Sequence, residues 1–186
     1  MNVNKRALIP VFLIYFLFSS EVFPQFDTGR NYAGPSIGLS FLGSAFQLGI
    51  NYEYAMSFSN IGIDTPGKLG VGGLFRYWSY SLAYYKGEWS YTDFLLGAEG
   101  NYHFKLKNRK IDPWLGLVLA FDFGKVSWTG KEKRPYYITE PSHGGFWLGL
   151  HAGGRYWISP NFAVSARIGF GTLSYGALEV GVDFKV

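Results

Sequence analysis

The sequence contains no cysteine among its 186 residues, so it can form neither a disulfide bond nor a thiolate metal site. Charged residues make up only 16% of the chain, whereas soluble domains contain about 25%. The formal net charge of +4 is small, and no basic patch is interleaved with stacking aromatic residues, which argues against nucleic acid as a partner. These absences leave an apolar, disulfide-free chain of single-domain size.

Apolar runs long enough to form a membrane-spanning helix are also missing. The longest run, "ALIPVFLIYFLF" at residues 7–18, follows Lys5 and Arg6 and is too short for a comfortable span. A short basic region followed by such a run is typical of a secretory signal peptide, and a retained N-terminal anchor is the alternative. We therefore expect a signal peptide at residues 1–25 and a mature chain at residues 26–186, with cleavage near Gln25.

Aromatic residues and glycine are abundant, and from about residue 35 apolar and polar residues alternate. The stretch "FQLGINYEYAM" at residues 46–56 is an example, because Gln47, Asn51 and Glu53 separate large apolar side chains. A period of two predicts a β-strand with one apolar and one polar face. Eight segments follow this pattern, most of them about ten residues long: 36–41, 46–56, 69–77, 93–104, 115–123, 146–156, 162–170 and 177–186.

Strands of about ten residues, in an even number, fit a membrane β-barrel. A soluble β-sandwich also alternates, but here the polar face is rich in Gly, Ser, Ala and Asn, which suit the crowded interior of a small barrel. The sequence thus predicts an all-β fold, an eight-stranded antiparallel up-and-down transmembrane β-barrel with its apolar face toward lipid. A ten-stranded barrel that recruits residues 55–66 or part of 124–142 is the alternative.

Tyrosine and tryptophan gather near the predicted strand ends, which favours interfacial girdles of aromatic side chains. Around one hairpin these are Tyr77, Trp78, Tyr80, Tyr84, Tyr85, Trp89 and Tyr91, and near the other end Tyr102, Trp114, Tyr156 and Trp157.

The ending "YGALEVGVDFKV" resembles the C-terminal strand of outer-membrane β-barrels, with an aromatic residue at Phe184; many members end directly on Phe, whereas this chain ends on Val186. The mature chain is similar to the small OmpA/OmpX-type barrels and to the outer membrane protein beta-barrel domain grouping. This resemblance implies the outer membrane of a Gram-negative-type bacterium, contact with outer-membrane lipid and lipopolysaccharide, and recognition of the last strand by the barrel-assembly machinery. It implies no specific activity.

The polar face holds charges of both signs, which must pair in a narrow, low-dielectric lumen. We expect them to form an internal plug, and a selectivity or gating network is the alternative. Arg155 and Arg167 are expected to meet Glu179, Asp183 or Asp122. The predicted lumen network comprises Glu53, Arg76, Asp93, Glu99, Asp122, His151, Arg155, Arg167, Glu179 and Asp183, and His103 shares their face.

The longest irregular segment, "TGKEKRPYYITEPSHG" at residues 129–144, is charged and aromatic. One interpretation is a surface contact with a polysaccharide, with lipopolysaccharide phosphates or with another cell, and the other is an ordinary solvated loop. The candidate contact residues are Lys131, Lys133, Arg134, Tyr136 and Tyr137.

Catalytic motifs are lacking. Ser142 and His143 are adjacent on a predicted loop near Glu140, a poor platform for a preorganised nucleophile, and we interpret them as ordinary loop residues. Three scattered histidines give no metal-ligand spacing, and no phosphate-binding loop is present, so we expect neither a cofactor nor enzymatic activity. The sequence favours a structural or surface-interaction role, with a narrow solute channel second and a lipid-modifying enzyme third.

Overall fold

The computed structural model describes residues 26–84, 87–130, 139–173 and 175–186. The expected signal peptide lies outside these ranges, as do all five candidate contact residues between 131 and 137. No helix within the described ranges is long and apolar enough to cross a membrane.

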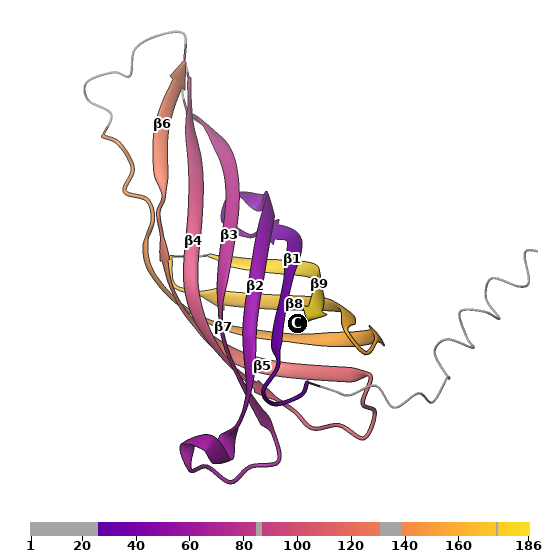
Figure 1. The fold of residues 1–186 in the computed structure, drawn as a ribbon. Coiled ribbons are helices and arrows are strands. Elements are labelled where there is room, and N and C mark those ends of the chain that lie inside the picture. The colour runs from indigo at the N-terminus through magenta and orange to yellow at the C-terminus, as the bar shows by residue number, and fades with distance from the viewer. Residues whose placement is uncertain (1–25, 85–86, 131–138, 174) are drawn as a thin grey trace, which may run out of the picture.

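Within the described ranges, nine β-strands and two short 3-10 turns make up the fold (Figure 1). The turns are η1 (Leu42–Ser44) and η2 (Phe58–Ile61). The strands are β1 (Asn31–Ser40), β2 (Ala45–Ser57), β3 (Lys68–Tyr84), β4 (Gly87–His103), β5 (Ile111–Asp122), β6 (Lys125–Gly130), β7 (Gly145–Ser159), β8 (Phe162–Gly171) and β9 (Gly176–Lys185).

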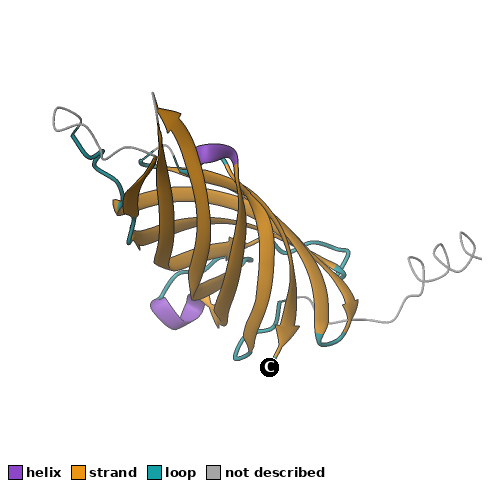
Figure 2. Cartoon of the chain, turned by 90° about the horizontal axis from the view of Figure 1, so that it is seen from above, coloured by secondary structure: helices purple, strands orange, loops and turns teal. Residues whose placement is uncertain are grey.

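These strands form a closed antiparallel barrel of eight positions (Figure 2). Consecutive strands pair with each other, except that β6 pairs with β4 and β7 pairs with β5, and β1 closes the ring against β9. β5 and β6 occupy one position, because β5 pairs with the Leu95–His103 part of β4 and β6 pairs with its Gly87–Thr92 part. The predicted eight-stranded barrel is confirmed, and the ten-stranded alternative is wrong: part of residues 55–66 forms η2, and residues 125–130 prolong an existing strand.

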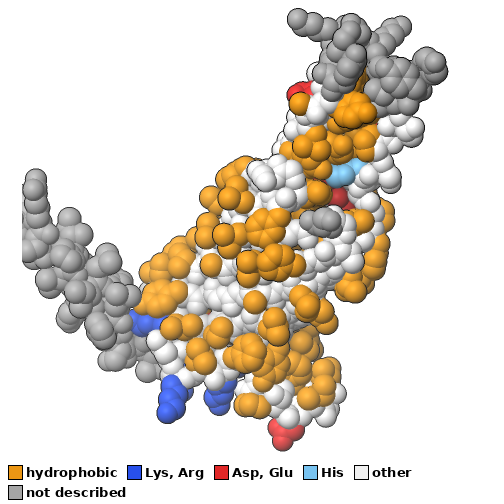
Figure 3. Space-filling view, turned by 180° about the vertical axis from the view of Figure 1, so that it is seen from behind, with side chains coloured by type: hydrophobic (Ala, Val, Ile, Leu, Met, Phe, Trp, Pro, Cys, Tyr) orange, Lys and Arg blue, Asp and Glu red, His pale blue; other side chains and the backbone are white. Residues whose placement is uncertain are grey.

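The apolar face of the alternation points outward (Figure 3). On β2, Phe46 and Ile50 are each 59% exposed, whereas Gln47 and Glu53 are each 1% exposed. A soluble barrel would have the reverse arrangement, so this distribution is that of a barrel whose outer wall faces hydrocarbon. The apolar face of the strands therefore points toward lipid, as predicted.

Several of the predicted girdle residues lie inside the barrel instead. Trp78, Trp89, Trp114 and Trp157 are all at most 4% exposed. Their strand parity places them on the lumen face; Trp78, for example, stands opposite the buried Asp93 in the β3–β4 pairing. The girdle interpretation is therefore wrong for these tryptophans. The alternation along the strand, and not proximity to a strand end, determines which face of the sheet a side chain occupies.

One sheet extends beyond the rest of the barrel. β2 pairs with β3 only as far as Trp78, so the later residues of β3 continue past the end of β2. There they pair with the first part of β4, which in turn pairs with β6. We call residues 79–84, 87–92 and 125–130 the projecting sheet (Figure 1). The first described residues and the C-terminal residues lie at the opposite end, where Asn31 and Val186 exchange backbone hydrogen bonds.

Candidate functional site: the polar lumen

Arg155 on β7 is the hub of the lumen near the chain termini. It donates from Nη2 to Glu53 Oε2 (2.7 Å), from Nε to Asp183 Oδ2 (3.0 Å) and from Nη1 to Asp112 Oδ2 (3.4 Å). All four side chains are at most 3% exposed. One guanidinium thus joins carboxylates from three other strands, and its planar set of donors is suited to holding several acceptors.

His103 shares two of these carboxylates. Its Nδ1 lies 2.8 Å from Asp112 Oδ1, and its Nε2 lies 2.9 Å from Glu53 Oε1. Ionised carboxylates only accept hydrogen bonds, so an imidazolium that donates from both ring nitrogens satisfies both partners. His103 therefore supplies a second positive charge beside Arg155.

Aromatic rings close this end of the barrel. Phe26 is fully buried and stacks on the His103 ring with centroids 3.6 Å apart and planes 7° apart. Tyr32 stacks on Phe26 at 4.7 Å and meets Trp157 edge-on at 5.7 Å. Outside this layer, a polar recess of about 560 Å³ is bordered by basic side chains that include Lys105.

The middle of the lumen holds two further ion pairs. Arg76 makes a two-pronged contact with Glu179, in which Nη2 donates to Oε2 (2.8 Å) and Nε to Oε1. Arg167 donates from Nη1 to Glu99 Oε2 (3.0 Å). These pairs cross the lumen, because β3 and β9, and likewise β4 and β8, are not neighbouring strands in the barrel.

Neutral side chains complete the network. Asn51 accepts from Arg76 (2.6 Å), and Tyr175 donates to Gln47 Oε1 (2.5 Å), while Gln47 donates to Glu179. His151 Nε2 lies 2.7 Å from Asn101 Oδ1. A Cβ on Gly116 would collide with the Asn101 and His151 side chains, so this glycine makes room for their contact.

A second apolar cluster fills the end of the lumen away from the termini. Trp78 stacks on Tyr175 with centroids 4.7 Å apart, and Trp147 meets Tyr175 edge-on at 5.2 Å. Between this cluster and the ion pairs lies a cavity of about 30 Å³, roughly the volume of one water molecule. Side chains therefore fill the lumen at both ends and in the middle.

Asp93, Asp122 and His143 form a separate group at the base of the projecting sheet. Asp93 on β4 is fully buried, and Asp122 at the end of β5 is 5% exposed. His143 Nε2 lies 2.5 Å from Asp93 Oδ1. Burial lowers the pKa of the His143 imidazole below its usual value, and the charge of Asp122 opposes this shift.

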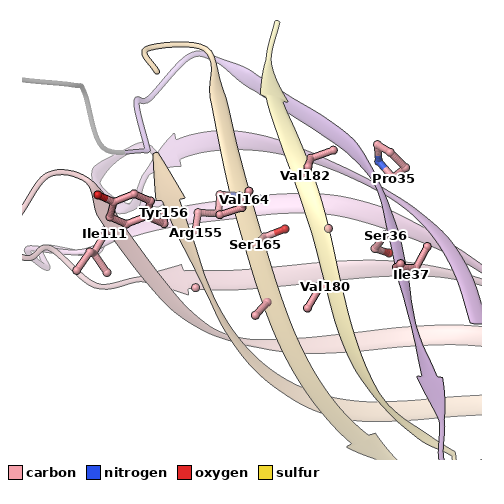
Figure 4. Close-up of a pocket in the computed structure, with 13 residues that line it drawn as sticks. Pro35, Ser36, Ile37, Ile111, Arg155, Tyr156, Val164, Ser165, Val180 and Val182 are labelled. Atoms are coloured by element: carbon pink, nitrogen blue, oxygen red, sulfur yellow. The ribbon is translucent and has the colours of Figure 1, made fainter. Parts of the chain in front are cut away.

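The outer wall carries a recess of its own, of about 820 Å³ (Figure 4). It lies across β1, β9, β8 and β7, where Gly154, Ala166 and Gly181 leave the wall thin. Valine and isoleucine side chains such as Val180 and Ile37 line its sides. Most of its lining is apolar, although Ser36, Arg155 and Ser165 also border it, so it is a recess of the outer wall rather than part of the polar site.

The structure places all ten predicted network residues on the lumen side, nine of them buried. Arg155 meets Asp183, one of the partners expected for it, whereas Arg167 meets Glu99, which was not among them. Asp122 contacts neither arginine and joins Asp93 instead. His143, interpreted as an ordinary loop residue, packs against Asp93 in the barrel mouth, which corrects that interpretation.

Sequence reasoning missed two other residues. Asp112 lies outside the eight predicted segments, but extending the alternation of residues 115–123 back by three positions places it on the lumen face, opposite Arg155 in the β5–β7 pairing. Phe26 lies outside every strand, so no periodicity signalled its burial.

Comparison with known proteins gives structural matches alone, since neither a protein-family model nor a curated protein sequence matches the chain. Neisserial surface protein A superposes with a TM-score of 0.54 at 19% identity, over 84% of this chain and 96% of that one. The fold is that of the small eight-stranded outer-membrane β-barrels.

Two further structures show the same likeness. The N-terminal β-barrel domain of Pseudomonas aeruginosa OprF matches at 15% identity with a TM-score of 0.54, over 86% of this chain and 98% of that one. Ail, the attachment invasion locus protein of Yersinia pestis, also matches at 15% identity and 0.54, over 84% and 97% of the two chains. Identities this low establish the shared fold and leave the role of this chain to its own residues.

Proposed function

We propose that the protein resides in the bacterial outer membrane as a closed barrel and acts through its projecting sheet as a surface for contact with other molecules. The observation that carries this proposal is the filled lumen, in which Arg155 is fixed by three carboxylates between two aromatic layers. A solute that passed through would have to displace these buried ion pairs, and separating one such pair costs about 3–5 kcal/mol. The barrel is then an anchor rather than a pore.

The outward apolar band supports the membrane location, and the expected signal peptide supports export. Outer-membrane barrels present their longer segments to the exterior. We accordingly place the projecting sheet outside the cell and the chain termini on the periplasmic side. The last strand, with its aromatic Phe184, is then available to the assembly machinery during insertion.

The projecting sheet offers exposed apolar side chains for contact. Leu82 is paired with Trp89, which is paired in turn with Trp128, and Tyr80 is paired with Tyr91; Trp89 and Tyr91 themselves are buried. Leu82 and Tyr84 are each 50% exposed. Because Lys131, Lys133 and Arg134 directly follow β6 in the sequence, the partner we propose is an anionic glycan such as phosphorylated lipopolysaccharide, held by charge and by ring stacking.

Planar-bilayer conductance of the refolded mature chain tests closure. A heat-modifiable band on gels shows that the barrel has folded, and we expect no discrete current steps from it. Regular ionic steps from the same preparation would support the narrow-channel alternative and contradict closure.

Contact with an anionic glycan is tested by changing charge at one end of the barrel only. Replacing the three basic residues after β6 by Gln is expected to weaken binding to immobilised lipopolysaccharide at least tenfold. The matched control removes three positive charges at the opposite end and should leave binding unchanged. Equal losses in both variants would indicate a nonspecific charge effect. The control substitutions are Lys105→Gln, Lys107→Gln and Arg109→Gln.

A further inference from the structure

The pair Asp93 and Asp122 differs from every other group of buried carboxylates in the described lumen. Glu53, Glu99 and Glu179 each contact an arginine. Within the described ranges, no lysine or arginine pairs with Asp93 or Asp122, and the only basic partner is His143. Two adjacent buried carboxylates without a cation are strongly unfavourable when both are ionised.

One oxygen atom of each carboxylate is also left without a hydrogen bond. Asp93 Oδ2 and Asp122 Oδ1 are buried and have no partner among the described residues. One ligand atom from each of Asp93, Asp122 and His143 lies within 4.8 Å of the others. Buried, unpartnered acceptors in so close a group call for a group that neutralises them.

The backbone is shaped to bring His143 to this point. Gly144 has a φ of +77°, a conformation that glycine adopts without strain, and a Cβ there would collide with Asp122 O and Gly124 N. Gly144 makes this close contact where the chain passes from β5 to β6. The segment that contains His143 and Gly144 therefore lies directly over the end of β5, and the His143 imidazole points toward Asp93.

Aromatic side chains hold the imidazole from the outside. Tyr91 meets the His143 ring edge-on with centroids 4.8 Å apart, and Tyr80 does so at 6.2 Å. Tyr80 and Tyr91 themselves stack at 4.6 Å. In the space-filling view, histidine and acidic side chains adjoin below the tip of the projecting strands (Figure 3).

We propose that Asp93, Asp122 and His143 form a binding site for a divalent transition-metal ion such as Zn²⁺. Two carboxylates and one imidazole are a donor set that Zn²⁺ accepts, with three protein ligands and one position left for water. The ion neutralises both carboxylates and takes the place of the proton between His143 Nε2 and Asp93 Oδ1. Tetrahedral ligands lie about 3.3 Å apart, so the imidazole moves outward by less than about 1 Å on binding.

Mixed nitrogen and oxygen ligands decide the class of metal. Mg²⁺ and Ca²⁺ prefer six or more oxygen ligands, whereas imidazole favours Zn²⁺, Ni²⁺ or Cu²⁺. A bound ion would tie the connection after β6 to β4 and β5, and would thereby fix the base of the projecting sheet. The site does not depend on whether the lumen conducts.

The test is calorimetric titration of the full chain with Zn²⁺, after refolding in a zwitterionic detergent without lipopolysaccharide and removal of metal with a chelator. We expect one equivalent to bind with a micromolar or lower Kd and to raise the unfolding temperature. Mg²⁺ at the same concentration should produce no shift. Co²⁺ should give visible absorption bands of a low-symmetry site.

Two ligand variants and two controls locate the binding. Asp93→Asn and His143→Gln should each raise the Kd at least tenfold and abolish the temperature shift. Asp64→Asn, on an exposed connection, and Ser142→Ala, beside the proposed ligand, should bind like the unmodified chain. Absence of saturable Zn²⁺ binding, or unchanged affinity in both ligand variants, would overturn the proposal in favour of a carboxylate pair that shares a proton.

Discussion

The two ends of the lumen treat buried charge differently. Near the termini, Glu53, Asp112 and Asp183 converge on Arg155 and His103, so the chain supplies its own positive charges. At the base of the projecting sheet, Asp93 and Asp122 meet a single half-buried imidazole. In the first group each carboxylate contacts Arg155, whereas in the second, among the described residues, only Asp93 pairs with a basic side chain and buried acceptors are left over.

This difference indicates which part of the lumen is structural. Compensated ion pairs from distant strands fix the barrel in one arrangement and leave little capacity for a ligand. An uncompensated pair is costly unless something binds there, so it is the better candidate for a site. Closure and ligand binding are thereby assigned to different groups within one narrow interior.

The largest effect is expected from Arg155→Met. The substitution leaves three buried carboxylates without their shared cation, and we expect a loss of about 5 kcal/mol in the free energy of unfolding. Urea unfolding, followed by the heat-modifiable gel band, measures the loss. A change below about 1 kcal/mol would show that the hub does not hold the barrel together.

Phe26→Ala removes the ring that covers His103 and is expected to cost about 3 kcal/mol. The matched control is Phe46→Ala on β2, whose side chain is 59% exposed on the outer wall and should matter less in detergent. The same unfolding experiment compares the two variants. Equal losses would contradict the assignment of Phe26 to the lumen.

Glu179→Gln keeps the shape of the side chain but removes its charge. Arg76 then retains hydrogen-bond acceptors without a counter-ion, and we expect a loss of about 2 kcal/mol. Thermal unfolding in detergent, compared with the unmodified chain, measures it. An increase in stability would mean that the central pairs are not compensated.

Lys185→Met should have the smallest effect, below about 1 kcal/mol. Lys185 Nζ pairs with Asp27 Oδ2 at 2.6 Å, but the Asp27 side chain is 35% exposed, so solvent screens the pair. If this variant lost as much unfolding free energy as the Arg155 variant in the same urea experiment, a partly exposed ion pair would matter as much as a buried one, which would contradict the account.

The fold was predictable because alternation with a period of two is local and nearly unbroken. It assigned Glu53 and Arg155 to the lumen and Phe46 to the outer wall, and it favoured eight strands over the ten-stranded alternative. The tryptophans were misplaced only where another rule, the aromatic girdle, was applied against the parity of Trp78. The same alternation therefore predicts the lumen-facing positions of the tryptophans as well.

The pairing inside the lumen was not predictable in the same way. Which arginine meets which carboxylate depends on the tilt and stagger of the strands, so Arg167 reaches Glu99 across the barrel. The position of His143 depends on the connection between β6 and β7, whose course is set by Gly144 and by the break between β5 and β6. These are three-dimensional constraints that periodicity does not encode.

The contrast between carboxylates that contact an arginine and those that do not is tested most directly by the urea-unfolding free energy of Asp93→Asn beside that of Glu179→Gln, both with a metal chelator present. Each variant turns one buried carboxylate into an amide. The account predicts opposite signs: Glu179→Gln destabilises the barrel, and Asp93→Asn stabilises it by relieving repulsion from Asp122. If both variants lose stability to the same extent, Asp93 and Asp122 are compensated like the rest of the lumen, and the account is contradicted.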